Sequence, residues 1–268
     1  MENLEGFDVR INFSGGDPLV VKENMRIIRR ATQYFGKDNL SISTTGYGLS
    51  FYDPSSIIPF VGRVKTTFDA PSDVEVPYRP NGYNKSNLVQ GKRYARAGAY
   101  VVVEIPISRF NHNPNLIENM YSELHEAGIS EAYIMKSFPV GRWVKGSNQI
   151  LADNEYTKAI EIYRRLEKKF VSPKLSIQYA LQDELVSTSL EKYIYRGSFG
   201  ITPKGLLLTN AWALKNCGDP LGDEFVLGDM RSNRLEEILK SQRARDSLTE
   251  QRIRLGQNQV IKREFLIV

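Results

Sequence analysis

The stretch Phe7–Pro18, FDVRINFSGGDP, contains the pattern that decides the fold. Val9, Ile11 and Phe13 alternate with polar residues, which predicts a β-strand. The strand ends in two adjacent glycines, and a helix is expected from Glu23 to Phe35 because apolar residues recur there at helical spacing. A strand, a tight turn and a helix in this order predict one unit of an α/β fold.

The same alternation continues along the chain, with further strands expected at 40–44, 63–68, 99–105, 132–135 and 174–179. Helices long enough to connect two parallel strands are expected at 84–96, at 115–127 and from residue 153. Such crossovers join parallel strands in a right-handed sense. About six units are two short of a classical eight-unit barrel, so the sequence predicts a partial TIM-like (β/α) barrel, with an open doubly wound sheet as the alternative.

The rhythm changes near residue 185, where we place a domain boundary between a barrel at 1–185 and a small α+β extension at 186–268. Residues 199–209 predict a hairpin and not another strand–helix unit. A glycine- and aspartate-rich segment follows at 216–229. A charged helix is expected from Leu235 to about Leu255, and a β-like tail at Gln259–Val268.

Composition excludes several classes of protein. With 41% hydrophobic and 25% charged residues, the 268-residue chain is not disordered. No apolar run is long enough for a membrane span. The 36 basic and 31 acidic residues leave a net charge of +5, which is too small and too dispersed to predict nucleic-acid binding. The single cysteine, Cys217, excludes an intrachain disulfide, predicts no metal site within the chain, and fits a cytoplasmic protein.

Polar or glycine-containing segments follow successive strands, and ligands of such folds bind outside the carboxyl ends of the strands. The segments are 14–18, 44–46, 67–69, 107–111 and 138–142. In the first, Gly15 and Gly16 allow close approach of a ligand to the main chain, and Asp17 can accept hydrogen bonds from an ammonium or a hydroxyl. The alternative is a tight turn in which Asp17 caps the following helix.

These segments, in this order, resemble those of the radical S-adenosylmethionine enzymes. FSGGDP at 13–18 is similar to the family's GGEP strand, and STTG at 43–46 to its TNG strand. KTTFD at 65–69 and the stretch 134–142 resemble the S-x-D and PxGR endings of later strands. ITPKG at 201–205, FVLGDM at 225–230 and LEEIL at 235–239 resemble phrases of the SPASM/twitch type of C-terminal extension.

The resemblance implies S-adenosylmethionine as the cofactor. It implies that Gly15, Gly16 and Asp17 hold the methionyl ammonium, and that Thr67 and Asp69 face the ribose or the methionyl carboxylate. Ser108 and Asn111 are further candidate ligands. Phe138, Val140 and the backbone around them would form an apolar shelf for adenine. No catalytic residue can be named.

The sequence departs from the family at one central point. The family's Cys-x3-Cys-x2-Cys motif, which holds a 4Fe–4S cluster, is absent, so this chain alone should be inactive and the cluster would need ligands from elsewhere. We expect a truncated chain, a second polypeptide that supplies the missing part, or a degenerate relative. We also expect an open strand edge at Val9–Phe13, which an upstream segment, a partner or a second copy would cover.

Two hypotheses follow. In the first, the chain is the core of a radical S-adenosylmethionine enzyme, which cleaves the cofactor reductively and abstracts hydrogen from an unknown peptide or small metabolite. In the alternative, it is a non-catalytic binding or partner protein on a degenerate barrel of this type. A generic α/β enzyme is weakly supported because no carboxylate pair or activated nucleophile stands out.

Overall fold

The computed structural model describes residues 2–4, 9–77, 79–137, 150–178, 181, 199–209, 214–216, 219–220, 222–246 and 263–267. The chain forms two compact units. The first unit consists of Met1–Ile42 and Ser189–Val268, and the second unit of Ser43–Thr188. The predicted boundary near residue 185 lies outside the described residues and stays a prediction.

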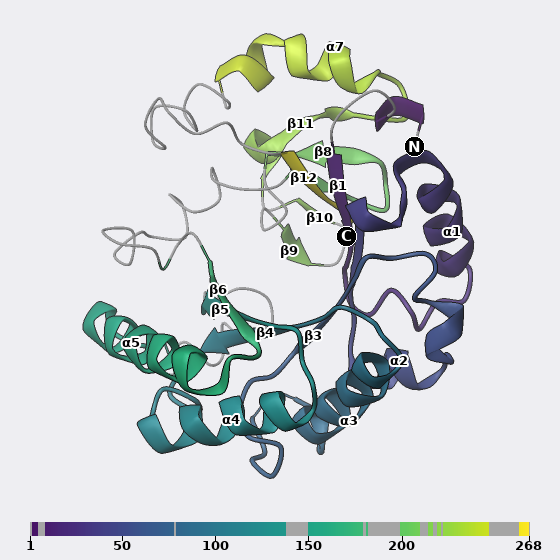
Figure 1. Ribbon diagram of the computed structural model, residues 1–268. Coiled ribbons are helices and arrows are strands. Elements are labelled where there is room, and N and C mark those ends of the chain that lie inside the picture. The colour runs from purple at the N-terminus through teal and green to yellow at the C-terminus, as the bar shows by residue number, and fades with distance from the viewer. Residues whose placement is uncertain are drawn as a thin grey trace. The chain divides into compact units, whose positions relative to one another are not determined.

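The second unit alternates strands and helices, as predicted. Its elements are α2 (Gly46–Ser50), β3 (Arg63–Thr67), α3 (Tyr83–Arg96), β4 (Val101–Ile107), α4 (Pro114–Glu126), β5 (Glu131–Lys136), α5 (Asp153–Phe170) and β6 (Lys174–Ile177). The strands are parallel neighbours in the order β3-β4-β5-β6. Helices α3, α4 and α5 cover one face of this sheet (Figure 1).

Residue patterns explain these elements. In β4, Val101, Val103 and Ile105 are buried together with Val102, as expected for a strand covered on both faces. Helix α4 buries only one stripe, which includes Ile117, Met120 and Leu124, and so packs as an amphipathic helix. In α3 the buried stripe is partly polar, because it contains asparagines at the start of the helix.

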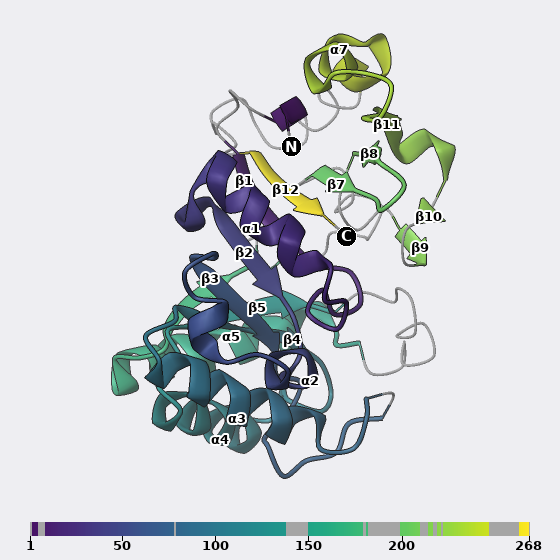
Figure 2. The same ribbon diagram turned by 90° about the vertical axis from the view of Figure 1, so that its right-hand side faces the viewer.

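The first unit combines the N-terminal strands with the C-terminal part of the chain. It contains β1 (Val9–Phe13), α1 (Asn24–Phe35), β2 (Leu40–Ser43), β7 (Phe199–Ile201), β8 (Leu206–Leu208), β9 (Leu214–Asn216), β10 (Asp219–Pro220), β11 (Val226–Asp229), α7 (Leu235–Lys240) and β12 (Arg263–Ile267). Its main strands follow the order β11-β8-β7-β12-β1-β2. Helix α1 lies beside β1 and β2 (Figure 2).

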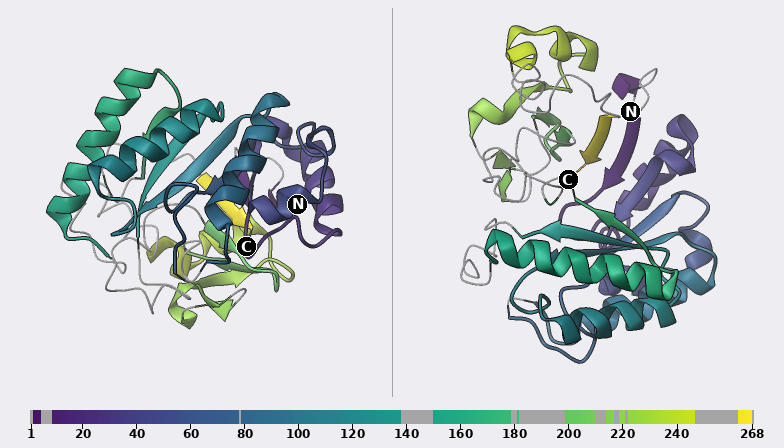
Figure 3. Two further views of the ribbon diagram at one scale, coloured as in Figure 1. Left: turned by 90° about the horizontal axis from the view of Figure 1, so that it is seen from below. Right: turned by 60° about the vertical axis from the view of Figure 1, so that its left-hand side comes forward.

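The expected open edge at Val9–Phe13 is wrong. Strand β12 pairs with β1 in parallel, from Val9 opposite Arg263 to Phe13 opposite Ile267. The other side of β12 pairs in parallel with β7, so that β12 lies between β1 and β7. In Figure 3 the gold strand β12 is seen beside the purple strand β1. The C-terminal tail thus supplies the hydrogen bonds that an upstream segment, a partner chain or a second copy was expected to supply.

The extension is partly as predicted. Strands β7 and β8 form the expected antiparallel hairpin, and β11 adds to it on the β8 side. Within the glycine- and aspartate-rich segment, β9 and β10 form a second antiparallel pair. The continuous helix expected from Leu235 is interrupted at Ser241, which has an extended backbone and accepts a hydrogen bond from the Ala244 N–H. Among the described residues, no helix is long and apolar enough to cross a membrane.

Candidate ligand-binding site at the strand ends

The turn after β1 has the backbone conformation that its glycines predict. Gly15 and Gly16 have φ angles of 91° and 65°, in the left-handed region that favours glycine. A Cβ placed on Gly16 would meet nothing within 4 Å, so the main chain is open to approach there. Asp17 Oδ1 accepts a hydrogen bond from the Leu19 N–H at 3.1 Å, which stabilises the turn. Because α1 begins only at Asn24, Asp17 does not cap that helix.

Asn111 connects the carboxyl ends of β3 and β4 in the second unit. Its side chain is fully buried, with 0% exposed. Its Nδ2 donates to the Asp69 carbonyl at 2.8 Å and to the Pro106 carbonyl at 2.9 Å. Its Oδ1 accepts from the Ser108 N–H at 2.8 Å. Two of these hydrogen bonds hold the backbone of predicted site residues, Asp69 and Ser108, and the third holds Pro106 near the end of β4.

Two asparagines on the first turns of α3 hold the end of β3 in the same way. Asn84 Oδ1 accepts from the Asp69 N–H at 2.9 Å. Asn87 Nδ2 donates to the Thr67 carbonyl at 2.6 Å, and its Oδ1 accepts from the Gly46 N–H at the start of α2. Both asparagines are buried. Buried amides that satisfy main-chain groups fix loops at defined positions.

Asp69 is 7% exposed and forms an ion pair with Arg79. The Arg79 Nε lies 2.6 Å from Asp69 Oδ2 and the Nη2 lies 3.3 Å from Oδ1, which is a bidentate geometry. The guanidinium also stacks 4.6 Å from the centre of the Tyr83 ring. Burial alone would lower the pKa of Arg79, but the charge and hydrogen bond of Asp69 together with Tyr83 outweigh burial, so the pKa is raised. Burial raises the pKa of Tyr83, so its hydroxyl stays protonated near neutrality.

The structure brings four of the predicted site residues together. Thr67 is the last residue of β3 and Asp69 follows it, Ser108 and Asn111 follow β4, and Asn111 links the two segments directly. The residues Gly15, Gly16 and Asp17 belong to the first unit. Phe138 and Val140 lie outside the described residues.

Sequence reasoning missed Arg79, Asn84 and Asn87. The asparagines could have been found from the helical period, since they lie on the stripe of α3 that also buries Gly91 and Tyr94. A polar residue on a buried stripe needs a hydrogen-bonding partner, and here the partners are the neighbouring strand ends. Arg79 carries no such signal because it lies in a loop.

The residues present do not fit a 4Fe–4S cluster. The sequence holds one cysteine, whereas such clusters are held by several thiolates. Among the described residues, no group of three histidine, cysteine, aspartate or glutamate side chains could hold a metal ion.

Comparison of the structure with solved structures identifies the class of fold. The chain is similar to anSMEcpe with bound AdoMet and the Kp18Cys peptide, with a TM-score of 0.64 and 14% identity over 91% of this chain and 70% of that one. It is similar to Streptococcus suis SuiB bound to S-adenosylmethionine, with a TM-score of 0.63 and 11% identity over 87% of this chain and 55% of that one.

Both proteins are radical S-adenosylmethionine enzymes. The chain therefore has the partial-barrel α/β fold of that superfamily, and the fold predicted from its sequence is confirmed. It spans about half of the length of SuiB. No protein-family model matches the sequence, and a search of curated proteins finds no match.

Proposed function

We propose that the chain binds S-adenosylmethionine, as the barrel and extension of a radical S-adenosylmethionine protein. The observation that supports this most is the fold shared over 91% of the chain with anSMEcpe, which was solved with AdoMet bound. The cytoplasm remains the proposed compartment, supported by the single cysteine.

The proposal assigns the methionyl ammonium to the turn after β1. Carbonyl groups at Gly15 and Gly16 would accept its hydrogen bonds, since left-handed glycines leave the main chain accessible. The Asp17 carboxylate would add a charge-assisted hydrogen bond. The carboxylate is held in the turn by the hydrogen bond that its Oδ1 accepts from the Leu19 N–H.

In the second unit the proposal assigns hydroxyl and carboxylate contacts to Thr67, Asp69 and Ser108. The Asp69 oxygens pair with Arg79, and each retains a lone pair for a ligand hydroxyl. Asn111 takes a positioning role, because its amide already serves three backbone groups. Phe138 and Val140 are proposed to contact the adenine.

S-adenosylmethionine, when reduced by a 4Fe–4S cluster, supplies a carbon radical that abstracts hydrogen. The cluster does not fit the residues of this chain, so its ligands would have to come from elsewhere. A peptide substrate is proposed because anSMEcpe and SuiB were solved with the Kp18Cys peptide and with the precursor peptide SuiA. A non-catalytic binding protein is the second candidate, favoured by the single cysteine.

Calorimetric titration of the chain with S-adenosylmethionine tests the proposal. The informative variant is Asp17→Asn, because asparagine keeps the oxygen that accepts from Leu19 and removes the charge. Loss of a hydrogen bond between charged groups should weaken binding by about 10-fold or more. Asp38→Asn, on an exposed turn of the same unit, is the matched control and should bind as the unaltered chain does.

Two results would count against the proposal. If the titration gives no saturable heat, the chain does not bind S-adenosylmethionine. If Asp17→Asn and Asp38→Asn weaken binding equally, Asp17 has no specific role in binding.

To separate the enzyme from the non-catalytic binder, the chain is incubated with iron, sulfide and a reductant, alone and with candidate partner chains. Cleavage of S-adenosylmethionine only with a partner that brings cluster ligands supports the enzyme. Binding without cleavage in every mixture supports the second candidate.

A further inference from the structure

A hollow of about 800 Å³ lies at the C-terminal end of α3. Its basic side chains are Lys92, Arg93 and Arg96, and its apolar lining includes Pro54, Ile58 and Val89. We propose that this hollow is a docking site for an acidic, partly apolar peptide segment of another protein. The proposal does not depend on binding of S-adenosylmethionine.

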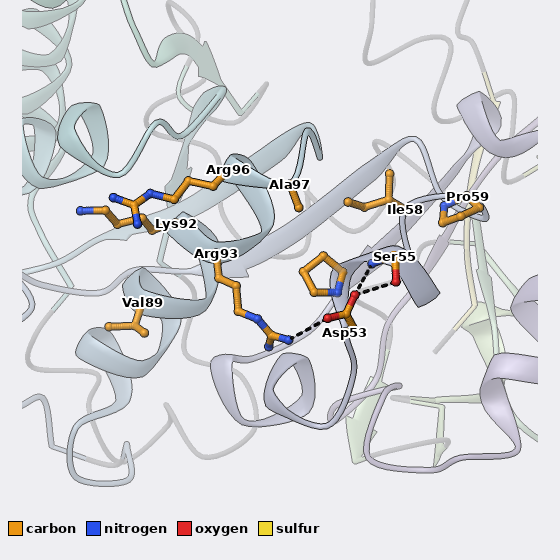
Figure 4. A pocket seen from close by; sticks show the side chains of 10 residues that line it. Asp53, Ser55, Ile58, Pro59, Val89, Lys92, Arg93, Arg96 and Ala97 are labelled. Atoms are coloured by element: carbon orange, nitrogen blue, oxygen red, sulfur yellow. Dashed lines mark hydrogen bonds and ion pairs between the residues drawn. The ribbon is translucent and has the colours of Figure 1, made fainter.

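Charge is the first argument. Arg93 is paired with Asp53 at 3.7 Å, and Asp53 is also held by Ser55 (Figure 4). Lys92 and Arg96 extend next to each other and away from Asp53 (Figure 4). Within the described part of the chain, neither has an acidic partner within 4.0 Å. Two adjacent cations that lack an acid are complementary to carboxylates of a ligand.

Exposed apolar side chains are the second argument. Val89, one turn before Arg93 on α3, is 53% exposed and lines the hollow. Outside the lining of the hollow, Tyr47 on α2 and Phe51, which directly follows α2, are 62% and 52% exposed and pack edge to face at 4.7 Å. Helices α2 and α3 are in contact. Exposed aromatic and aliphatic groups beside charges are typical of protein–protein contacts.

The position of the hollow separates it from the candidate cofactor site. The end of α3 leads to the start of β4, and the segment that contains Pro54 and Ile58 leads to the start of β3. The hollow therefore lies toward the amino ends of the strands. Asp69 and Asn111 follow the carboxyl ends of the same two strands. A ligand bound at the carboxyl ends of the strands would therefore not contact the side chains that line the hollow.

The dimensions favour a peptide over a small molecule. The stripe formed by Val89, Lys92 and Arg96 in the hollow continues along α3 to the exposed Lys85 outside it, a length of about 17 Å at 1.5 Å per residue. An extended segment of about five residues spans this length. Pockets for small molecules enclose most of their ligand, whereas this hollow opens onto the helix surface.

Fluorescence anisotropy with a labelled eight-residue peptide of alternating glutamate and leucine tests the proposal. We expect saturable binding, and a loss of at least about 10-fold in affinity when Lys92→Glu is combined with Arg96→Glu. The matched control combines Arg164→Glu with Lys168→Glu on the exposed side of α5, which changes the net charge equally. The control should keep the original affinity within about twofold. Circular dichroism confirms that both variants are folded, and the milder pair Lys92→Gln with Arg96→Gln replaces the reversal if it unfolds.

Three results would overturn the proposal. The peptide could fail to bind, or the control could lose as much affinity as the α3 variant, which would show attraction by net charge alone. Displacement of the peptide by inorganic phosphate at equal concentration would show a small-anion site instead. A peptide with glutamine in place of each glutamate should bind more weakly than the acidic peptide. Equal affinities of the two peptides would show that charge does not contribute to binding.

Discussion

Replacing Asn111 with alanine removes three hydrogen bonds at the ends of β3 and β4. The Ser108 N–H would lose its acceptor in a buried position, at a cost of about 1 to 3 kcal/mol. The carbonyls of Asp69 and Pro106 would each lose a donor, at about 1 kcal/mol apiece. We therefore expect Asn111→Ala to lower the free energy of unfolding by about 3 to 5 kcal/mol.

Urea denaturation followed by far-UV circular dichroism measures this loss. Asn115→Ala is the matched control, because Asn115 is exposed near the start of α4, and it should change the stability by less than about 0.5 kcal/mol. Asn111→Asp adds a second comparison, since it nearly conserves volume but replaces the amide donors with a carboxylate facing two carbonyls. It should destabilise the protein as much as alanine does.

A loss below about 1 kcal/mol for Asn111→Ala would refute the reasoning. It would mean that water or a local shift satisfies the three backbone groups, so that Asn111 does not position the strand ends. If Asn111→Asp leaves the stability unchanged while Asn111→Ala lowers it, the loss comes from packing of the side chain and not from its hydrogen bonds.

Three further predictions concern separate contacts. Deleting residues 263–268 leaves the outer side of β1 unpaired, so the shortened chain should self-associate in light scattering, and a monomer would contradict the role of β12. Arg79→Met leaves the Asp69 carboxylate without its cation and should cost about 1 to 3 kcal/mol in urea denaturation, partly recovered by adding Asp69→Asn. Hydrogen bonds from Arg231 lower the pKa of Asp229 to about 2. The contact therefore stabilises the fold above about pH 4, and this stabilisation is lost as the pH falls towards 2. Arg231→Gln should raise the pKa of Asp229 in an NMR titration.

The strands and helices of the second unit could be predicted because their signals are local. Periods of two and 3.6 identify β3 and α4, and glycine or proline residues mark their ends. The partner of β1 could not be predicted in this way. Pairing between β1 and β12 joins residues more than two hundred positions apart, and nothing in either strand's own pattern specifies its neighbour.

The positions of the candidate site residues at the strand ends could be predicted, but their contacts could not. Strand ends could be located from the sequence, and the structure places Thr67, Asp69, Ser108 and Asn111 at the ends of β3 and β4. Their individual hydrogen bonds depend on side chains from α3 and from loops, such as Arg79. Asn111 was predicted to be a ligand contact, whereas its donors and acceptor are used by the backbone. Such use of a side chain can be read only from coordinates.

The claim that the turn after β1 binds S-adenosylmethionine is tested most directly by NMR. The amide resonances of a uniformly ¹⁵N-labelled chain are assigned and followed during titration with S-adenosylmethionine. The account predicts saturable shifts at Gly15 and Gly16, reduced in the Asp17→Asn variant. Resonances of this turn that stay unchanged at ligand concentrations of about 1 mM, where even weak binding is visible, would contradict it.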